Sequence, residues 1–211
     1  MTGETEEVRA PMREAASQGG DLKDRVRGLV LQAIVARKAD PKAIRAVMKD
    51  TVEGLGEGLG GHADSAGATL KSAVSGLDEA IGKSLYALQS AVEETWGNGR
   101  RFADADLREA YDAVRGLDDD LVGTLKEVGG RTKGVLKDEF NHISEHLGRN
   151  GSDTGSQIKS VLAVLGRDFG HTATEAGRAL KSDAREATGR LSAVTSGILR
   201  GLADALDGRK P

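Results

Sequence analysis

An eleven-residue repeat of apolar side chains is the feature that most constrains what this chain can fold into. Its first row is Ile44, Leu55, Ala66, Leu77 and Leu88, and two further rows follow the same step at fixed offsets. Eleven residues in three turns correspond to about 3.67 residues per turn, so the apolar stripe stays on one side of a nearly straight helix. The alternation of period two that is typical of strands does not persist over a comparable length. The repeat therefore predicts long amphipathic helices and an all-α fold.

The same period returns in the middle and in the last part of the chain, so three long segments share one pattern. A stripe of this kind is expected to be buried, either against other helices of the chain or against a partner. The residues that we expect to form this interaction stripe are Leu55, Leu59, Leu70, Leu77, Ile81, Leu85, Leu88, Val92, Trp96, Leu121, Leu125, Leu136, Ile143, Leu147, Ile158, Leu165, Phe169, Leu180, Leu191 and Leu202.

Turn and capping residues separate these segments. Asp40 places a capping carboxylate directly before Pro41, and proline is well tolerated at the first position of a helix. Glycine and asparagine at residues 97–99 indicate a turn, and a second break is expected at residues 148–153. Gly208 follows the last apolar residues, where a C-terminal glycine is typical.

The predicted architecture is an elongated bundle of three long amphipathic helices with one short N-terminal helix, in a single domain over residues 21–208. Residues 1–20 carry no sustained apolar stripe, and we expect them to form a mobile N-terminal tail. The helices are expected at about residues 22–38, 41–96, 103–148 and 153–207.

Five glycines cluster inside the first long segment, at Gly54, Gly56, Gly58, Gly60 and Gly61. One interpretation is a loop that divides the segment in two, because each glycine inside a helix costs about 1 kcal/mol relative to alanine. The other interpretation is a continuous but weakened helix, because the eleven-residue phase continues unchanged through the cluster. We favour the continuous helix and expect its least stable point here.

Composition and charge exclude several classes of protein. The chain has no cysteine, which excludes disulfides, thiolate nucleophiles and cysteine-ligated metals. Its net charge of −3 argues against nucleic-acid binding, which depends on basic side chains at phosphates. No apolar run approaches the roughly 20 residues of a transmembrane helix, and the polar, acidic N-terminus does not resemble a signal peptide. We therefore expect a cytoplasmic protein with no transmembrane span.

A short motif in the second long segment matches a metal-binding pattern. His142, Glu145 and His146 form H-x-x-E-H, in which two histidines four residues apart can hold one zinc ion beside a glutamate base. The motif resembles that of inverted zincins, which implies a downstream glutamate as third ligand in a much larger domain. Only Glu175 and Glu186 follow in this sequence. We favour a helix whose histidines flank the stripe, and expect no metal, no cofactor and no catalytic residue.

Three other sequence features indicate a function less specifically. Glu139 and His142 have the E-x-x-H spacing of di-iron helical bundles, which need a second copy and two further glutamates; a homodimer would supply the copy. The G-x-G-x-x-G of residues 56–61 lacks the preceding strand that dinucleotide binding requires, so we reject it. A basic excess over residues 21–39 fits a solvated helix face, which we favour, or an anionic membrane surface.

Two resemblances follow from these patterns. The repeat from Ile44 to Leu206 is similar to the repeats of apolipoproteins, late-embryogenesis-type protective proteins and bacterial phasins, as a likeness of pattern alone. More narrowly, the segments Asp104–Leu125 and Ser196–Leu206 resemble a family of uncharacterised bacterial helical proteins. That resemblance implies a bacterial source and adds no known activity.

These observations predict a non-enzymatic structural or interaction protein whose helices self-associate or bind a helical partner. The alternatives are a phasin-like or apolipoprotein-like coat on lipid or storage granules, and a stress-protective protein that becomes helical on drying. Stripe composition favours the first, because Ala173, Ala176, Ala184 and Ala187 permit close helix packing and insert poorly into lipid. A thin bundle buries little apolar area, so we expect a marginal monomer whose burial is completed by association or by an apolar surface.

Overall fold

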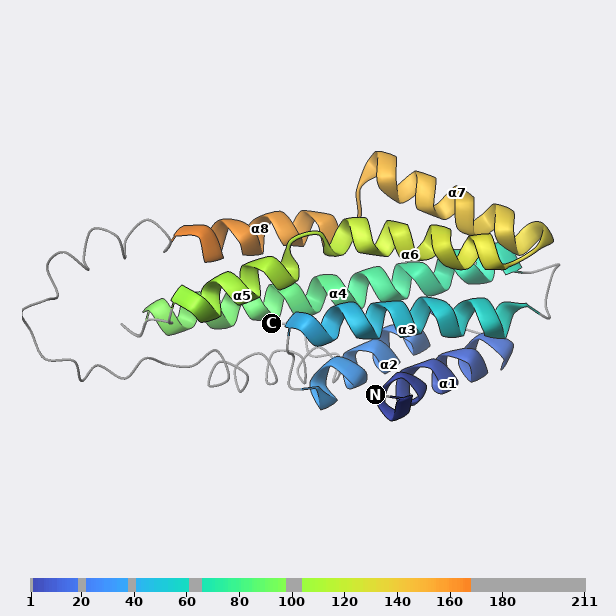
Figure 1. Cartoon of the computed structure of the whole chain (residues 1–211), viewed down its shortest axis with the longest axis horizontal. Helices are drawn as coiled ribbons and strands as arrows, with labels where there is room; N and C mark the ends of the chain where they lie inside the picture. The colour runs from blue at the N-terminus through green and yellow to red at the C-terminus, as the bar shows by residue number, and fades with distance from the viewer. Residues whose placement is uncertain (1, 19–21, 38–40, 61–65, 98–103, 168–211) are drawn as a thin grey trace, which may run out of the picture.

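The computed structural model describes residues 2–18, 22–37, 41–60, 66–97 and 104–167, and these residues form helices and turns with no strand. The fold is all-α, as the repeat predicted. Most of the helices lie along the long axis of the molecule (Figure 1). The helices of the described residues are α1 (Thr2–Gln18), α2 (Leu22–Ala36), α3 (Pro41–Leu59), α4 (Ala66–Gly97), α5 (Asp104–Val114), α6 (Leu117–Arg131), α7 (Gly134–Asn150) and α8 (Asp153–Arg167).

The longest of these helices, α4, packs against helices on several sides. Helices α2 and α8 pack along it, and α3 and α7 also contact it. Helix α3 packs against α1 on one side and against α6 on another, while α5 lies between α3 and α8. Helix α7 packs on α6 and tilts away from the other helices (Figure 1). The result is a bundle of several short helices arranged around α3 and α4.

All eight helices contribute to a single apolar core. Most members of the predicted stripe lie in it: Leu55, Leu59, Leu70, Leu77, Ile81, Leu85, Leu88, Val92, Leu121, Leu125, Leu136, Ile143, Ile158 and Leu165 are buried. Trp96 and Leu147 are half-buried and pack against the same core. Phe169, Leu180, Leu191 and Leu202 lie outside the described residues. Within the described part, the stripe is therefore the internal core of one chain.

The expected mobile tail at residues 1–20 is wrong for most of its length, because residues 2–18 form α1. This helix buries Val8, Met12, Ala15 and Ala16 against the rest of the bundle. A helix of 17 residues needs only one short apolar face to dock, so the absence of a long repeating stripe did not exclude it.

The prediction of three long uninterrupted helices is also wrong in its details. The segment 41–96 is divided, because α3 ends at Leu59 and α4 begins at Ala66. The segment 103–148 is divided twice: Gly116 and Gly134 adopt positive φ angles of 87° and 58°, which end one helix and begin the next. Helix α4 runs back along α3 and α7 packs back on α6, so the apolar phase continues although the helix does not (Figure 1).

The two predicted breaks between long segments are confirmed. Helix α4 ends at Gly97 and α5 begins at Asp104, while α7 ends at Asn150 and α8 begins at Asp153. Gly151, between α7 and α8, has a φ of 77°. Pro41 is the first residue of α3, as its position after a capping residue predicted. The predicted end of the last helix at residue 207 lies outside the described residues.

Candidate interaction site

The residues of the H-x-x-E-H motif lie on the outer face of α7. His142, Glu145 and His146 are all exposed. A ring nitrogen of His146 lies 2.8 Å from the side-chain nitrogen of Asn150, one turn later on the same helix. Within the described part of the chain, no group of three potential ligands lies close enough to hold a metal ion. The described helices therefore bring no third ligand to this histidine pair.

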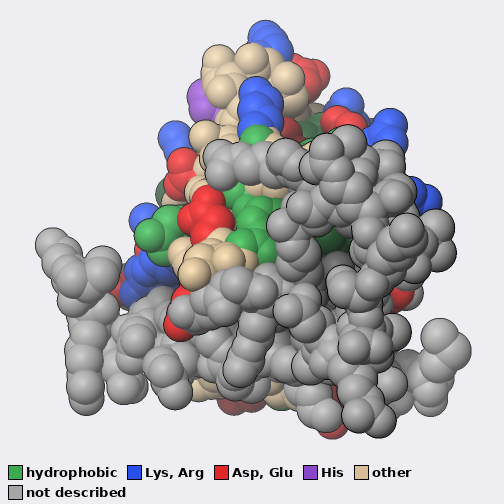
Figure 2. Space-filling view, turned by 90° about the vertical axis from the view of Figure 1, so that its left-hand side faces the viewer, with side chains coloured by type: hydrophobic (Ala, Val, Ile, Leu, Met, Phe, Trp, Pro, Cys, Tyr) green, Lys and Arg blue, Asp and Glu red, His purple; other side chains and the backbone are tan. Residues whose placement is uncertain are grey.

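Charged side chains lie mainly on the outside of the described bundle. In the end-on view of Figure 2, Lys and Arg side chains lie along the upper and outer edges of the described part, and apolar and acidic side chains lie nearer the middle. Among the described residues, the large apolar side chains with high exposure are Tyr86 and Val135. The chemistry of this surface consequently depends on how its charges are paired.

Close backbone packing joins α1 to α3. A Cβ atom built on Gly54 would lie 2.6 Å from the carbonyl oxygen of Arg9, and one on Gly58 would lie 2.4 Å from that of Arg13. The residue numbers rise together on the two helices, so α1 and α3 are parallel at this contact. Gly54 and Gly58 are four residues apart and therefore share one face of α3. We call this face, together with the flanking Glu53 and Glu57, the α3 seam.

Ion pairs flank the seam on the side of Glu53 and Glu57. Arg9 donates through Nη1 to Glu53 at 3.0 Å and through Nε to Glu57 at 2.9 Å. Arg13 Nη1 lies 3.5 Å from Glu57 Oε2. The hydrogen bond from Arg9 lowers the pKa of Glu57, and the same bond raises the pKa of Arg9. At the seam, the glycines therefore allow the backbone of α1 to approach closely, and the glutamates bind its arginines.

The other side of α3 holds α6 by similar means. A Cβ atom on Gly56 would lie 2.6 Å from Val128 Cγ1, so this glycine admits a side chain of α6. Arg131 of α6 lies 3.5 Å from Glu53 of α3 and also pairs with Glu127 of its own helix. Gly54, Gly56 and Gly58 thus allow close packing on two faces of α3, which ends at Leu59, before Gly60.

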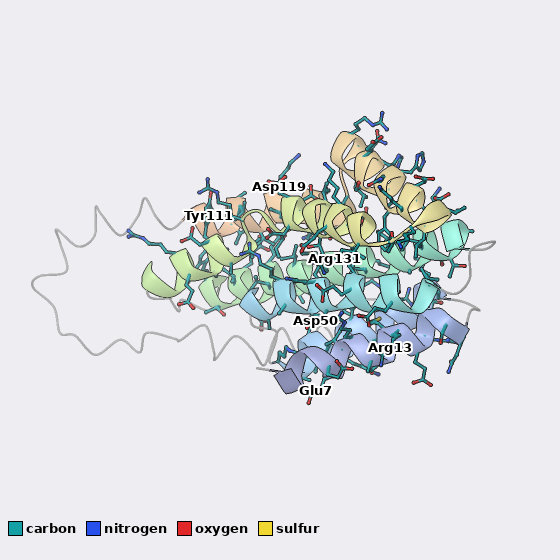
Figure 3. The ribbon with its side chains drawn as sticks, turned by 45° about the vertical axis from the view of Figure 1, so that its right-hand side comes forward. Glu7, Arg13, Asp50, Tyr111, Asp119 and Arg131 are labelled. Carbon is teal, nitrogen blue, oxygen red and sulfur yellow. The ribbon has the colours of Figure 1, made fainter. Side chains whose placement is uncertain are left out.

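A buried carboxylate belongs to the same face of α3. Asp50 is one turn before Gly54 and is 7% exposed; Figure 3 shows it on α3 above α1. Burial raises the pKa of Asp50 to about 6, and the negative charge of Glu53 adds to this effect. The positive charges of Arg37 and Arg9 act in the opposite direction but do not cancel it. At neutral pH the seam therefore holds a buried negative charge at one end.

A second polar cluster holds the start of α8 on α4. The carboxylate of Asp78 accepts hydrogen bonds from the backbone N–H groups of Asp153 at 2.9 Å and Thr154 at 3.0 Å. The hydroxyl of Ser152 accepts from the backbone N–H of Gly155 at 2.7 Å and itself donates to Asp118. These contacts satisfy free N–H groups at the first turn of α8. We call this arrangement a tertiary helix cap, because residues outside α8 cap its first turn, and the polar groups of the cap are hydrogen-bonded to one another.

A third cluster joins α2 to α4 around Glu79. Its carboxylate lies 3.2 Å from Lys23 and Arg27 of α2 and 2.9 Å from Lys83 of α4. Burial acts to raise the pKa of Glu79, but the hydrogen bonds from Lys83 and Lys23 and the charge of Arg27 outweigh it and hold the pKa at about 2. Basic residues of the predicted basic segment thus contact a carboxylate of the bundle.

The seam is not among the predicted features, although the sequence carries a signal for it. The spacing of Gly54 and Gly58 by four residues is the pattern that lets two helix backbones approach closely. Arg9 and Arg13 repeat the same spacing in the segment expected to be a tail. The helix penalty of glycine gives no indication of this relation between the two segments.

The fold and these contacts define an all-α bundle protein whose helices are joined by close packing and by interhelical ion pairs. None of the described helices contains a stretch both long and apolar enough to span a bilayer. The chain belongs to a family of unknown function, DUF6781, whose model matches residues 2–208. No curated protein and no solved structure matches the chain.

Proposed function

We propose that this protein acts by helix–helix association, with itself or with a helical partner, and that it is not an enzyme. The observation that carries the proposal is the length of the apolar stripe in the sequence. The described helices share one core, and the stripe continues in the sequence at the same spacing through Phe169, Leu180, Leu191 and Leu202. Apolar side chains at helical spacing are stabilised by burial, and a helix of a second molecule offers such burial.

The placement of reactive groups supports the same proposal. Among the described residues, the carboxylates with lowered pKa values, Glu57 and Glu79, are paired with arginine and lysine of neighbouring helices. A hollow of about 240 Å³ between α1 and α2 is lined mainly by apolar side chains, including Val8, Met12 and Leu29. Charged groups that join helices favour a packing role over a catalytic one.

Sedimentation of the wild-type chain and of Leu191→Asp tests the proposal. Wild-type protein should associate in a concentration-dependent manner across roughly a hundredfold dilution, because association follows mass action. Leu191→Asp should lose most of this association, because it places a charge in the part of the stripe beyond the described core. Ser192→Asp is the matched control, because it adds the same charge at the next residue, which does not belong to the stripe. This variant should associate like the wild-type chain.

The results separate this proposal from its alternatives. Association that is equal in Leu191→Asp and Ser192→Asp would contradict a role for the stripe. A wild-type chain that stays monomeric alone, but gains helix by circular dichroism on lipid vesicles, would instead support the phasin-like or apolipoprotein-like coat. A chain that is unstructured with and without vesicles would support the stress-protective alternative.

A further inference from the structure

We propose that the α3 seam is a docking site for the α1 helix of a second copy of this chain, and that the chain's own α1 is its resident occupant. This inference rests on the proposed function, because it names one surface through which copies associate. The exchange would be reciprocal, with each α1 lying on the α3 of the other copy, as closed symmetric dimers require.

The steric character of the seam selects a helix like α1. The backbone of an approaching helix must lie close against Gly54 and Gly58, because carbonyl oxygens of α1 leave no room there for a Cβ atom. The Cβ atoms of α1 also approach this face: a Cβ atom on Gly58 would lie 2.6 Å from that of the small residue Ala16, and one on Gly54 would lie 2.8 Å from that of Met12.

The charge of the seam selects the same helix. Asp50, Glu53 and Glu57 place three carboxylates along this side of α3. Arg9 and Arg13 of α1 repeat at one-turn spacing and pair with the two glutamates. Charge complementarity of this kind sets partner choice and register more than raw affinity. A second copy offers the same small residue and the same arginines in the same register.

Helix α1 is suited to exchange because it lies at the edge of the bundle, where it packs mainly on α3 and α2. Of its side chains, Val8, Met12, Ala15 and Ala16 are the buried apolar ones. Pro11 lies inside the helix and has no backbone N–H to donate to the carbonyl of the preceding turn, which weakens the isolated helix. Its polar contacts with α3 are the ion pairs of Arg9 and Arg13, which are partly exposed and open to water.

Reversing charges in two complementary chains tests the inference directly. One chain carries Arg9→Glu and Arg13→Glu, and the other carries Glu53→Arg and Glu57→Arg. In either chain alone, α1 and the α3 seam carry charges of the same sign. They therefore repel each other, whether the two helices belong to one molecule or to two identical copies. In an equal mixture of the two chains, the α1 of each chain can lie on the α3 of the other, and both of these contacts then pair opposite charges. The mixture should therefore sediment at about twice the monomer mass and should regain hydrogen-exchange protection of residues 2–18.

A chain that carries all four substitutions is the matched control. Its own α1 and α3 are again complementary, so it should protect residues 2–18 without the second chain. Protection in this control shows that the substituted helices still dock. If the control is protected while the equal mixture stays monomeric with α1 unprotected, α1 does not exchange between copies and the inference is wrong.

The unaltered seam is tested with Gly54→Leu, whose larger side chain would meet the Arg9 carbonyl and Met12. Gly123→Leu is its control, because a Cβ atom there has no neighbour within 4 Å. The wild-type dimer should be lost in Gly54→Leu and kept in Gly123→Leu. A dimer that survives Gly54→Leu but is lost in Leu191→Asp would overturn this inference and leave the proposed function standing. A wild-type chain that is monomeric at all concentrations would contradict exchange.

Discussion

At the scale of single residues, the glycines of α3 allow neighbouring helices to pack closely. Gly54, Gly56 and Gly58 lie inside α3, and side chains in their places would meet the backbone of α1 or Val128 of α6. The usual cost of glycine in a helix is about 1 kcal/mol. Here the close approach of a second helix offsets that cost, because packed backbones gain dispersion contacts and exclude water from the seam.

Gly54→Ala should therefore destabilise the protein although alanine is the better helix former. Overpacking of a close contact costs about 1–3 kcal/mol, which exceeds the gain in helix propensity. Gly123→Ala, on the exposed side of α6 with open space around it, should stabilise the protein by about 0.5–1 kcal/mol. Urea unfolding of both variants checks the two signs. Stabilisation by Gly54→Ala equal to that by Gly123→Ala would contradict close packing at the seam.

At the scale of helices, several of the described elements are short, and their ends are not all capped by side chains of their own. Helix α6 follows Gly116 in a left-handed conformation and has no side-chain cap of its own. Helix α8 receives its cap from two directions, since Ser152 lies in the preceding turn and Asp78 lies on α4. The start of α8 is thus coupled to α4, and the core contacts of both helices favour the same arrangement.

Asp78→Asn should weaken this coupling. The amide has one acceptor oxygen and no charge, so it replaces poorly a carboxylate that accepts two backbone N–H groups. We expect a loss of about 1–2 kcal/mol, the range for removal of a good helix cap. Hydrogen exchange should show the larger loss of protection in α8. Glu94→Gln, at an exposed position of α4, is the control and should change little. Equal effects of the two variants would argue against the tertiary cap.

At the scale of the whole molecule, two carboxylates give the bundle opposite responses to pH. Glu79 has a pKa of about 2 in the fold against an ordinary value of 4.5, so its contribution to stability is present above pH 4.5 and is lost as the pH falls toward 2. Asp50 has a pKa of about 6 against an ordinary value of 3.8, so the folded state binds its proton more tightly. Its contribution is present below about pH 4 and is lost as the pH rises to 6.

Asp50→Asn should remove the second of these responses. The free energy of unfolding should rise by on the order of 2 kcal/mol at pH 7, because a buried charge is replaced by a neutral amide. Between pH 4 and 6 the variant should lack the decline in stability that the wild-type chain shows. Chemical unfolding at a series of pH values measures both effects. A variant that is less stable than the wild-type chain at pH 7 would show that the Asp50 charge is compensated in the fold.

The eleven-residue repeat determined the all-α class and the buried stripe of the described helices from α3 onward, and the glycine-rich turns marked the breaks after residues 97 and 150. These properties follow from local spacing, because burying one face of a helix requires apolar residues at the helical period. Tertiary structure decided the rest. The division of the long segments depends on helices folding back to bury their faces against each other, and the docking of α1 depends on glycines about 45 residues away along the chain. Neither contact leaves a mark in the periodicity of a single segment, since each becomes favourable only when the second helix is present.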